Sequence, residues 1–210
     1  MNPNNSGYVF GEYRPPTLIL SAYAFVDGGY FRAEGKSLGI DFPNPHSTIE
    51  YVMSAVREMG GYSPTMNSVF TRRMYFYDAT DPASGTTGLD VERYWNAIER
   101  LHDTEVRFGT IRGKPRRQKG VDILLAVDML VGSFNKLFDV AVLVAGDEDF
   151  VPLVIEVQRR GVSVVVAAVS RTTSSELIRV ADRYIDLSER GCWAFTKNPI
   201  TIAATGSETL

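Results

Sequence analysis

Short segments that are almost entirely apolar are the feature that most restricts how this chain can fold. They occupy residues 17–26, 139–145 and 162–169. A strand that is apolar on both faces has to be covered on both faces, as in parallel sheets whose crossover connections are helices. The first segment stops at the Asp-Gly-Gly sequence of residues 27–29, which predicts a tight turn. The sequence therefore predicts an α/β fold with a mainly parallel central sheet.

Local signals place the other elements. Ser47 and Glu50 have the spacing of a capping box, so a helix is expected from there to Gly60. Asp90 is expected to cap another helix after a Gly/Ser/Thr loop at 80–88. The remaining strands are expected at 69–77, 104–112 and 184–187, and the remaining helices at 91–101, 121–134, 150–160 and 174–181.

Length and composition indicate one domain. The 210 residues are 44% hydrophobic and 22% charged, the balance of an ordinary globular protein. The mostly polar stretches at both ends predict flexible tails at 1–16 and 199–210, which leaves a domain at 17–198.

Several classes of protein are excluded. The single cysteine, Cys192, and two histidines allow neither a disulfide framework nor a Cys/His zinc cluster. The apolar run at 18–26 is too short to span a bilayer. A net charge of −3 predicts no strong non-specific attraction of the whole chain to nucleic acid. We therefore expect a soluble cytoplasmic protein.

Aspartates follow two of the predicted strands. Asp27 ends the first strand, and Asp147 and Asp149 come directly after the strand at 139–145. Asp122 lies in the first turn of the helix at 121–134, and Asp128 lies six residues further on. Six residues correspond to about 600° of helix, so these two side chains point roughly 120° apart. Ligands of parallel α/β sheets bind beyond the carboxyl ends of the strands, so we expect the aspartates to converge there.

Clustered carboxylates predict a metal site. They repel one another and need a cation or a proton when they are partly buried together. Oxygen ligands select Mg²⁺ or Mn²⁺, and such ions orient phosphate and activate water. The predicted site consists of Asp27, Asp122, Asp147 and Asp149, with Asp128 as the weakest member, and the predicted chemistry is phosphodiester hydrolysis.

Each aspartate also has an ordinary structural explanation. Asp27 could form a turn or cap a helix, and Asp147 or Asp149 could cap the helix at 150–160. Asp122 could stabilise a helix N-terminus, and Asp128 could be a buried residue bonded to backbone or to a basic side chain. All of these explanations together are less favoured than one shared site.

A basic segment immediately precedes Asp122. Its cations include Lys114, Arg116, Arg117 and Lys119. A run of charges is commonly a solvated loop, but beside an acidic helix it could hold a polyphosphate backbone without reading bases. Lys119 is the best single candidate for a phosphate contact.

Two other residues are candidates for substrate binding. Tyr30 could stack on a base, as aromatic residues do in single-strand binders, although packing within the domain is the more usual role. Ser170 follows the strand at 162–169 and so lies at the edge where a phosphate would bind.

The acidic stretches resemble those of a known family. The chain is similar to the NYN-domain proteins of the PIN-like nuclease superfamily, in particular to the bacterial LabA-like group (domain of unknown function 88). The matching stretches are "AFVDGGYF" at 24–31, "KGVDILLAVDML" at 119–130, "VLVAGDEDFVPLV" at 142–154, "GVSVVVAA" at 161–168 and "SSELIRVADRYIDL" at 174–187.

This resemblance implies a three-layer α/β/α PIN-like fold with an acidic pocket for Mg²⁺ or Mn²⁺. It also implies a ribonuclease, an endoribonuclease acting on single-stranded RNA, with Asp27, Asp122, Asp128, Asp147 and Asp149 at the positions of the family's acidic residues. Many relatives have an asparagine three residues after the first aspartate, where this chain has Tyr30. A homodimer could extend the phosphate-binding groove.

Two alternatives to a nuclease remain open. The chain could be a PIN-like module that binds RNA or protein without turnover, which Tyr30 and the acidic net charge allow. It could also be a phosphatase with Asp27 as nucleophile, but such enzymes place a second aspartate two residues on, where this chain has Gly29.

Overall fold

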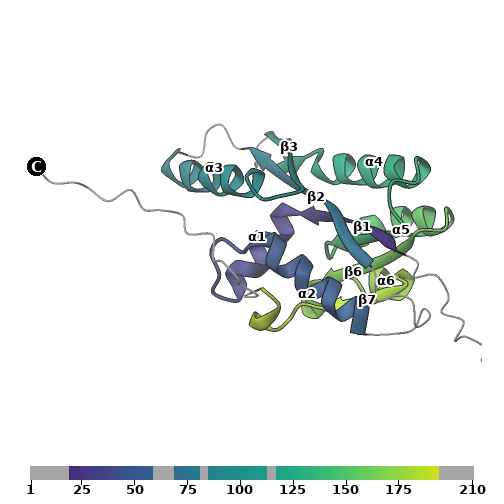
Figure 1. Cartoon of the computed structure of the whole chain (residues 1–210). Helices are drawn as coiled ribbons and strands as arrows, with labels where there is room; N and C mark the ends of the chain where they lie inside the picture. The colour runs from purple at the N-terminus through teal and green to yellow at the C-terminus, as the bar shows by residue number, and fades with distance from the viewer. Residues whose placement is uncertain (1–18, 59–68, 81–84, 113–116, 194–210) are drawn as a thin grey trace, which may run out of the picture.

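A seven-stranded sheet forms the centre of the molecule (Figure 1). The computed structural model describes residues 19–58, 69–80, 85–112 and 117–193. At 80, 85–89, 110–112 and 117–119 it describes the backbone alone. The strand order is β4-β3-β2-β1-β5-β6-β7, with every neighbouring pair parallel except β3 and β4. The strands are β1 (Leu20–Asp27), β2 (Val69–Thr80), β3 (Thr104–Arg112), β4 (Arg117–Lys119), β5 (Val140–Val144), β6 (Ser163–Ala168) and β7 (Arg183–Asp186).

Helices cover both faces of this sheet. Along β1, Ala24 and Val26 face one buried cluster with α1, α2 and α3, while Phe25 faces a second cluster with α4, α5 and α6. This confirms the expected α/β/α layers. The helices are α1 (Gly28–Ser37), α2 (Pro45–Glu58), α3 (Gly85–Glu99), α4 (Val121–Phe134), α5 (Val151–Gln158) and α6 (Ser175–Val180), and single turns occur at η2 (Glu148–Phe150), η3 (Ser170–Thr172) and η4 (Arg190–Cys192).

Two elements have the predicted bounds, β3 and α4. The other predicted strands and the helices α5 and α6 are found within a few residues of the expected limits. Both predicted tails lie outside the described residues, at 1–16 and 199–210. None of the described helices is long and apolar enough to cross a membrane.

The tight turn predicted at 27–29 is wrong, because helix α1 begins at Gly28. The side chain of Asp27 accepts a hydrogen bond of 3.1 Å from the backbone N–H of Tyr30 and so caps this helix. Gly28 is required by close packing. A Cβ there would lie 2.6 Å from Cε1 of Phe76 and 2.7 Å from the carbonyl oxygen of Tyr77.

Two other helix starts were predicted wrongly. Helix α2 begins at Pro45, so Ser47 is a buried residue within the helix and does not cap it. The side chain of Asn44 accepts a hydrogen bond of 2.9 Å from the N–H of His46. Proline suits the first helical position because its missing N–H would be unpaired there anyway. Helix α3 begins at Gly85, within the predicted loop, so Asp90 is an exposed interior residue and not a cap.

Part of the basic segment before Asp122 forms a strand and not a loop. Residues 113–116 lie outside the described part of the chain, but residues 117–119 form the short strand β4, antiparallel to β3. Gly120 then adopts a left-handed conformation, with φ of 84°, and connects β4 directly to α4.

Replacing Gly28 with alanine is expected to destabilise the fold, because the added methyl group overlaps Phe76 and the backbone of Tyr77. Overpacked sites of this kind lower the free energy of unfolding by about 1–3 kcal/mol. Urea denaturation measures the effect. Gly191→Ala is the control, since a Cβ at Gly191 meets nothing within 4 Å. Equal midpoints for Gly28→Ala and wild type would contradict this packing.

Candidate active site

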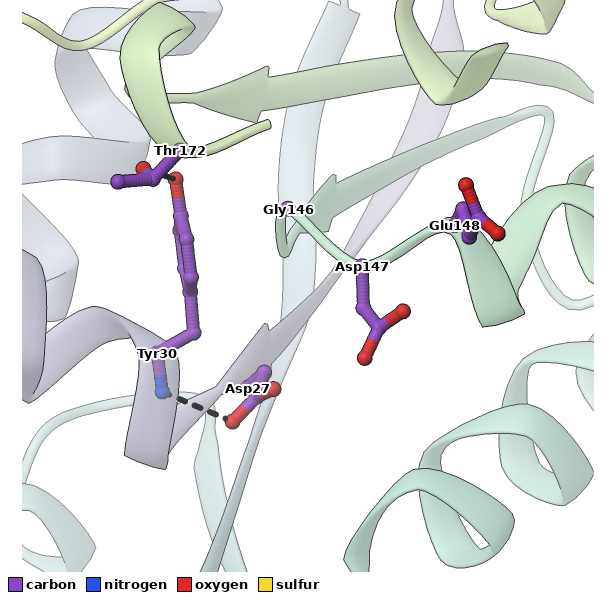
Figure 2. A pocket seen from close by; sticks show the side chains of 6 residues that line it. All are labelled: Asp27, Tyr30, Gly146, Asp147, Glu148 and Thr172. Carbon is purple, nitrogen blue, oxygen red and sulfur yellow. Dashed lines mark hydrogen bonds between the residues drawn. The ribbon is translucent and has the colours of Figure 1, made fainter. Parts of the chain in front are cut away.

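A pocket of about 400 Å³ opens at the carboxyl ends of the central strands. Its walls come from the end of β1, the start of α1, the loop after β5 and η3, as Figure 2 shows. The lining residues are Asp27, Tyr30, Gly146, Asp147, Glu148 and Thr172. The carboxylates of Asp27 and Asp147 border the same space, and that of Glu148 is turned away from Asp27.

Asp27 reaches the pocket because β1 lies in the middle of the sheet. The neighbours of β1 in the sheet are β2 and β5. Val26 is paired with Val144 of β5, and Asp27 is paired with Tyr77 of β2. Burial, opposed by the bond from the Tyr30 N–H and reinforced by the negative charges of Asp122 and Asp78, raises the pKa of Asp27 to about 6. The carboxylate is therefore held in a site that disfavours its own charge.

Asp147 enters from the turn after β5. It has an extended backbone, and its Oδ1 accepts a hydrogen bond of 3.0 Å from the N–H of Asp149, which caps η2. Gly146 before it has no room for a side chain, since a Cβ would lie 2.8 Å both from the carbonyl oxygen of Thr172 and from Cε2 of Tyr30. The turn is thus pressed against the opposite wall of the pocket.

Asp122 stands close to the carboxylates of the β5 turn. It lies in the first turn of α4, as expected. Partial burial and the charges of Asp147 and Asp149 raise the pKa of Asp122. The charge of Asp122 in turn helps to raise the pKa of Asp27. The four aspartates of the predicted site therefore share one electrostatic environment. Asp122 and Asp149 lie beside the pocket and do not line it.

Asp128 lies away from the pocket. Its Oδ2 accepts a hydrogen bond of 2.9 Å from the hydroxyl of Tyr77 and is 3.2 Å from Nε of Arg107. These contacts hold α4 against β2 and β3. Burial raises the pKa of the Tyr77 hydroxyl, and the negative charge of Asp128 and the hydrogen bond to it raise this pKa further. Asp128 thus makes the contacts expected of a structural residue.

Tyr30 forms a wall of the pocket. Its hydroxyl accepts a hydrogen bond of 2.8 Å from the N–H of Val169 and lies 3.5 Å from Oγ1 of Thr172. The ring is therefore held at both ends, by the helix α1 and by the start of η3. Burial raises the pKa of this hydroxyl, so it stays neutral.

Ser170 is not brought into the pocket. Its N–H donates to Oδ1 of Asp186 at 3.2 Å, and its hydroxyl lies 3.1 Å from that of Ser188. The residue of η3 that does line the pocket is Thr172. Ser170 instead connects η3 to the end of β7.

Half of the basic segment can be located. Arg117 and Lys119 lie in β4, where the backbone alone is described, and Lys114 and Arg116 lie outside the described residues. β4 ends one residue before α4 begins, so the backbone of Lys119 is three residues from Asp122.

A family model described as the NYN domain matches residues 24–188. The chain belongs to the NYN domain family. NYN domains are generally nuclease-type domains. No curated protein matches the sequence.

The NYN fold of this chain is also found among solved structures. One match is the crystal structure of a protein of unknown function from Vibrio parahaemolyticus, with 18% sequence identity and a TM-score of 0.59. The alignment covers 85% of this chain and 98% of that one. At this identity the similarity shows a shared fold.

Some residues around the NYN pocket were not singled out from the sequence. Glu148 and Thr172 line it, and Asp78 lies beside Asp27 at the end of β2. Asp78 is fully buried and paired with Arg32 by bonds of 2.7 and 2.8 Å, and it also accepts bonds of 2.8 Å from the indole of Trp95 and from the N–H of Ala79. Its position directly after the apolar part of β2 is the signal that would have found it.

Few of the side chains that line the NYN pocket could bind a metal ion through oxygen. Within the described ranges, no group of three or more His, Cys, Asp or Glu side chains is arranged to hold one metal ion. Asp27 and Asp147 are the aspartates that line the pocket. Mg²⁺ is commonly bound through one or two carboxylates, with water and substrate phosphate completing its shell, so the donor set fits such an ion.

Replacing Asp27 with asparagine is expected to stabilise the metal-free protein at neutral pH. The pKa of Asp27 rises from 3.8 to about 6 on folding, so the folded state binds the proton more tightly. The resulting stability is fully present below pH 3.8 and is lost as the pH rises through 6. At pH 7.5 the ionised carboxylate costs about 2–3 kcal/mol, which asparagine avoids while it keeps the helix cap.

Thermal unfolding in EDTA at pH 7.5 and pH 4.0 measures this difference. Asp27→Asn should unfold at a higher temperature than wild type at pH 7.5, and the gap should close at pH 4.0. Asp90→Asn is the control, because Asp90 is exposed on α3. A gap that is the same at both pH values would contradict the raised pKa.

Proposed function

We propose that this NYN domain is a metal-dependent ribonuclease that hydrolyses phosphodiester bonds of single-stranded RNA. The observation that carries the proposal is the acidic site itself. Asp27, Asp122 and the pair Asp147 and Asp149 come from three separate segments at the edge of the sheet where a parallel α/β fold binds ligands. The charges of Asp147 and Asp149 raise the pKa of Asp122, and the charge of Asp122 helps to raise the pKa of Asp27.

The electrostatics favour a cation as part of the site. An isolated cluster of carboxylates is unfavourable, and the raised pKa values of Asp27 and Asp122 express that cost. By contrast, Asp78 at the same edge has Arg32 as a partner. The carboxylates that face the pocket lack such a partner among the described side chains. Mg²⁺ or Mn²⁺ would supply the missing positive charge.

Asp27 and Asp147 are the residues that would hold the ion. When bound, a divalent ion stabilises negative charge on phosphate and lowers the pKa of water. Asp122, whose pKa is raised, is suited to accept a proton at a carboxylate oxygen from the attacking water. Asp149 adds negative charge that favours the cation.

The substrate is inferred from the pocket and the basic segment. A pocket of about 400 Å³ has room for a single nucleotide, but a stacked duplex would have to open to enter it. Lys114, Arg116, Arg117 and Lys119 come just before Asp122 in the chain and would bind the phosphates on either side of the cleaved bond. The ring of Tyr30 limits the depth of the pocket.

Within the family, we assign the chain to the LabA-like group. The assignment rests on the acidic helix motif at 119–130 and the acidic turn motif at 142–154. A cytoplasmic location fits this assignment and the single cysteine.

One feature favours a second function, an RNA- or protein-binding module without turnover. Tyr30 stands where many relatives have an asparagine, and its ring and hydroxyl are engaged with Gly146 and Val169. No amide at this position can orient water or phosphate. Metal binding without cleavage of any nucleic acid would favour this second function.

Asp147→Asn is expected to lower the cleavage rate about 100-fold or more, because it removes a charge from the pocket. Asparagine can still cap η2, so folding should be kept. The assay compares labelled single-stranded RNA, duplex RNA and DNA in Mn²⁺, Mg²⁺ or EDTA. Asp90→Asn, at an exposed position on α3, is the matched control and should cleave like wild type. Full activity of Asp147→Asn would overturn the proposal.

Metal binding is expected to be measurable without turnover. At pH 7.5, Mn²⁺ at 100 times its dissociation constant should raise the free energy of unfolding by about 2.7 kcal/mol. The matching rise in melting temperature should be lost in the double variant Asp27→Asn/Asp147→Asn and kept in Asp90→Asn. An equal rise in all three proteins would place the ion elsewhere.

A further inference from the structure

Helix α4 is apolar on the side that faces away from the sheet. Its inner side packs Val121, Leu125 and Met129 into the core. On its outer side, Ile123 is 68% exposed, Val127 and Val131 are each 50% exposed, and Phe134 is 60% exposed. Leu137, just beyond the helix, is 45% exposed. We call these five residues the outer face of α4.

A solvent-facing helix normally carries charged residues on its outer side. At 100° per residue, the outer face of α4 and its neighbours Leu124, Ala126 and Leu130 fill an arc of about 160° without a charged residue. Asp122 and Asp128 flank this arc. Figure 1 shows α4 at the periphery, with no other described element over its outer side. Such a helix is typical of a buried position, so the face requires a partner.

Two of the charged residues at the rim, Asp128 and Arg160, are paired within the chain, and the third, Asp122, belongs to the acidic site. Asp128 is bound by Arg107, and Arg160 lies 3.7 Å above the ring of Phe134 while it pairs with Glu156. The partner therefore meets an apolar centre with a polar rim, which is the pattern of protein–protein interfaces. A highly charged partner such as nucleic acid is not favoured.

The spacing of the outer face indicates a second copy of the same chain. Ile123, Val127 and Val131 form one ridge with a spacing of four residues, and Val127 is at the middle of α4. A two-fold axis at Val127 brings Ile123 of one copy against Val131 of the other and Val127 against itself. Ridges of this spacing pack into each other at about −50° with axes roughly 8–10 Å apart, and the antiparallel helix dipoles attract.

The apolar area of the face is close to what a dimer needs. Large apolar side chains that are about half exposed contribute roughly 100 Å² each, so the five present on the order of 500 Å². That is in the upper part of the range for the largest apolar patch on a monomer. With its polar rim, it approaches the roughly 800 Å² that each partner of a stable complex buries.

We propose that the outer face of α4 is the interface of a homodimer with a two-fold axis at Val127. The pockets of the two copies then lie on one assembly, since each α4 carries Asp122 of its own site at its start. The dimer does not depend on nuclease activity, and loss of either leaves the other testable.

Cysteine cross-linking tests the position of the axis. The chain has one cysteine, Cys192, which is buried, so an introduced thiol has no exposed competitor. Val127→Cys should form an intermolecular disulfide on oxidation at least tenfold faster than Ile123→Cys, although Ile123 is more exposed. Along the helix axis, two Ile123 residues would lie about 12 Å apart in this dimer. A mixture of Ile123→Cys and Val131→Cys should cross-link, and faster linking of Ile123→Cys alone would overturn the axis.

Sedimentation of the full chain tests the dimer itself. Val131→Glu should raise the dimer dissociation constant at least 100-fold, and circular dichroism should show an unchanged fold. Asp122→Asn, beside the face but not in it, should stay dimeric. A monomeric wild-type chain overturns the proposal. A monomer that Val131→Glu also destabilises would mean that a segment of the same chain covers the face.

Discussion

The position of β1 between β2 and β5 is the constraint on which the rest of the structure depends. Its residues from Ala22 to Val26 are hydrogen bonded on both sides and buried or half-buried. β1 has no freedom to shift along its neighbours without turning its apolar side chains to the wrong face. Asp27, at its last position, is therefore held at the sheet edge in the same place that the turn after β5 reaches.

Two carboxylates at this edge of the sheet differ in whether a basic side chain matches their charge. Asp78 accepts four hydrogen bonds, two of them from Arg32, and so acts as an internal anchor for α1 and α3. Asp27, next to it, accepts a hydrogen bond from the N–H of Tyr30, and the negative charge of Asp122 helps to raise its pKa. The same residue type is structural where its charge is matched and available for chemistry where it is not.

Sequence reasoning recovered the fold well where the pattern was local. The bounds of β3 and α4 follow from local patterning of apolar and polar residues. It failed at α1, because Asp-Gly-Gly has the composition of a turn, while the reason for Gly28 is the ring of Phe76 on another strand. It also overlooked that Asn44, and not Ser47, stands before α2.

The sequence by itself determined the layered α/β class and a set of carboxylates worth considering. Both depend on apolar patterning and on the rule that ligands of parallel sheets bind beyond the carboxyl ends of the strands. Only the tertiary structure decided which carboxylates share an environment. It paired Asp128 with Arg107, made Tyr30 a wall of the pocket and left the outer face of α4 uncovered. These outcomes depend on residues far apart in the chain, whose proximity is set by packing.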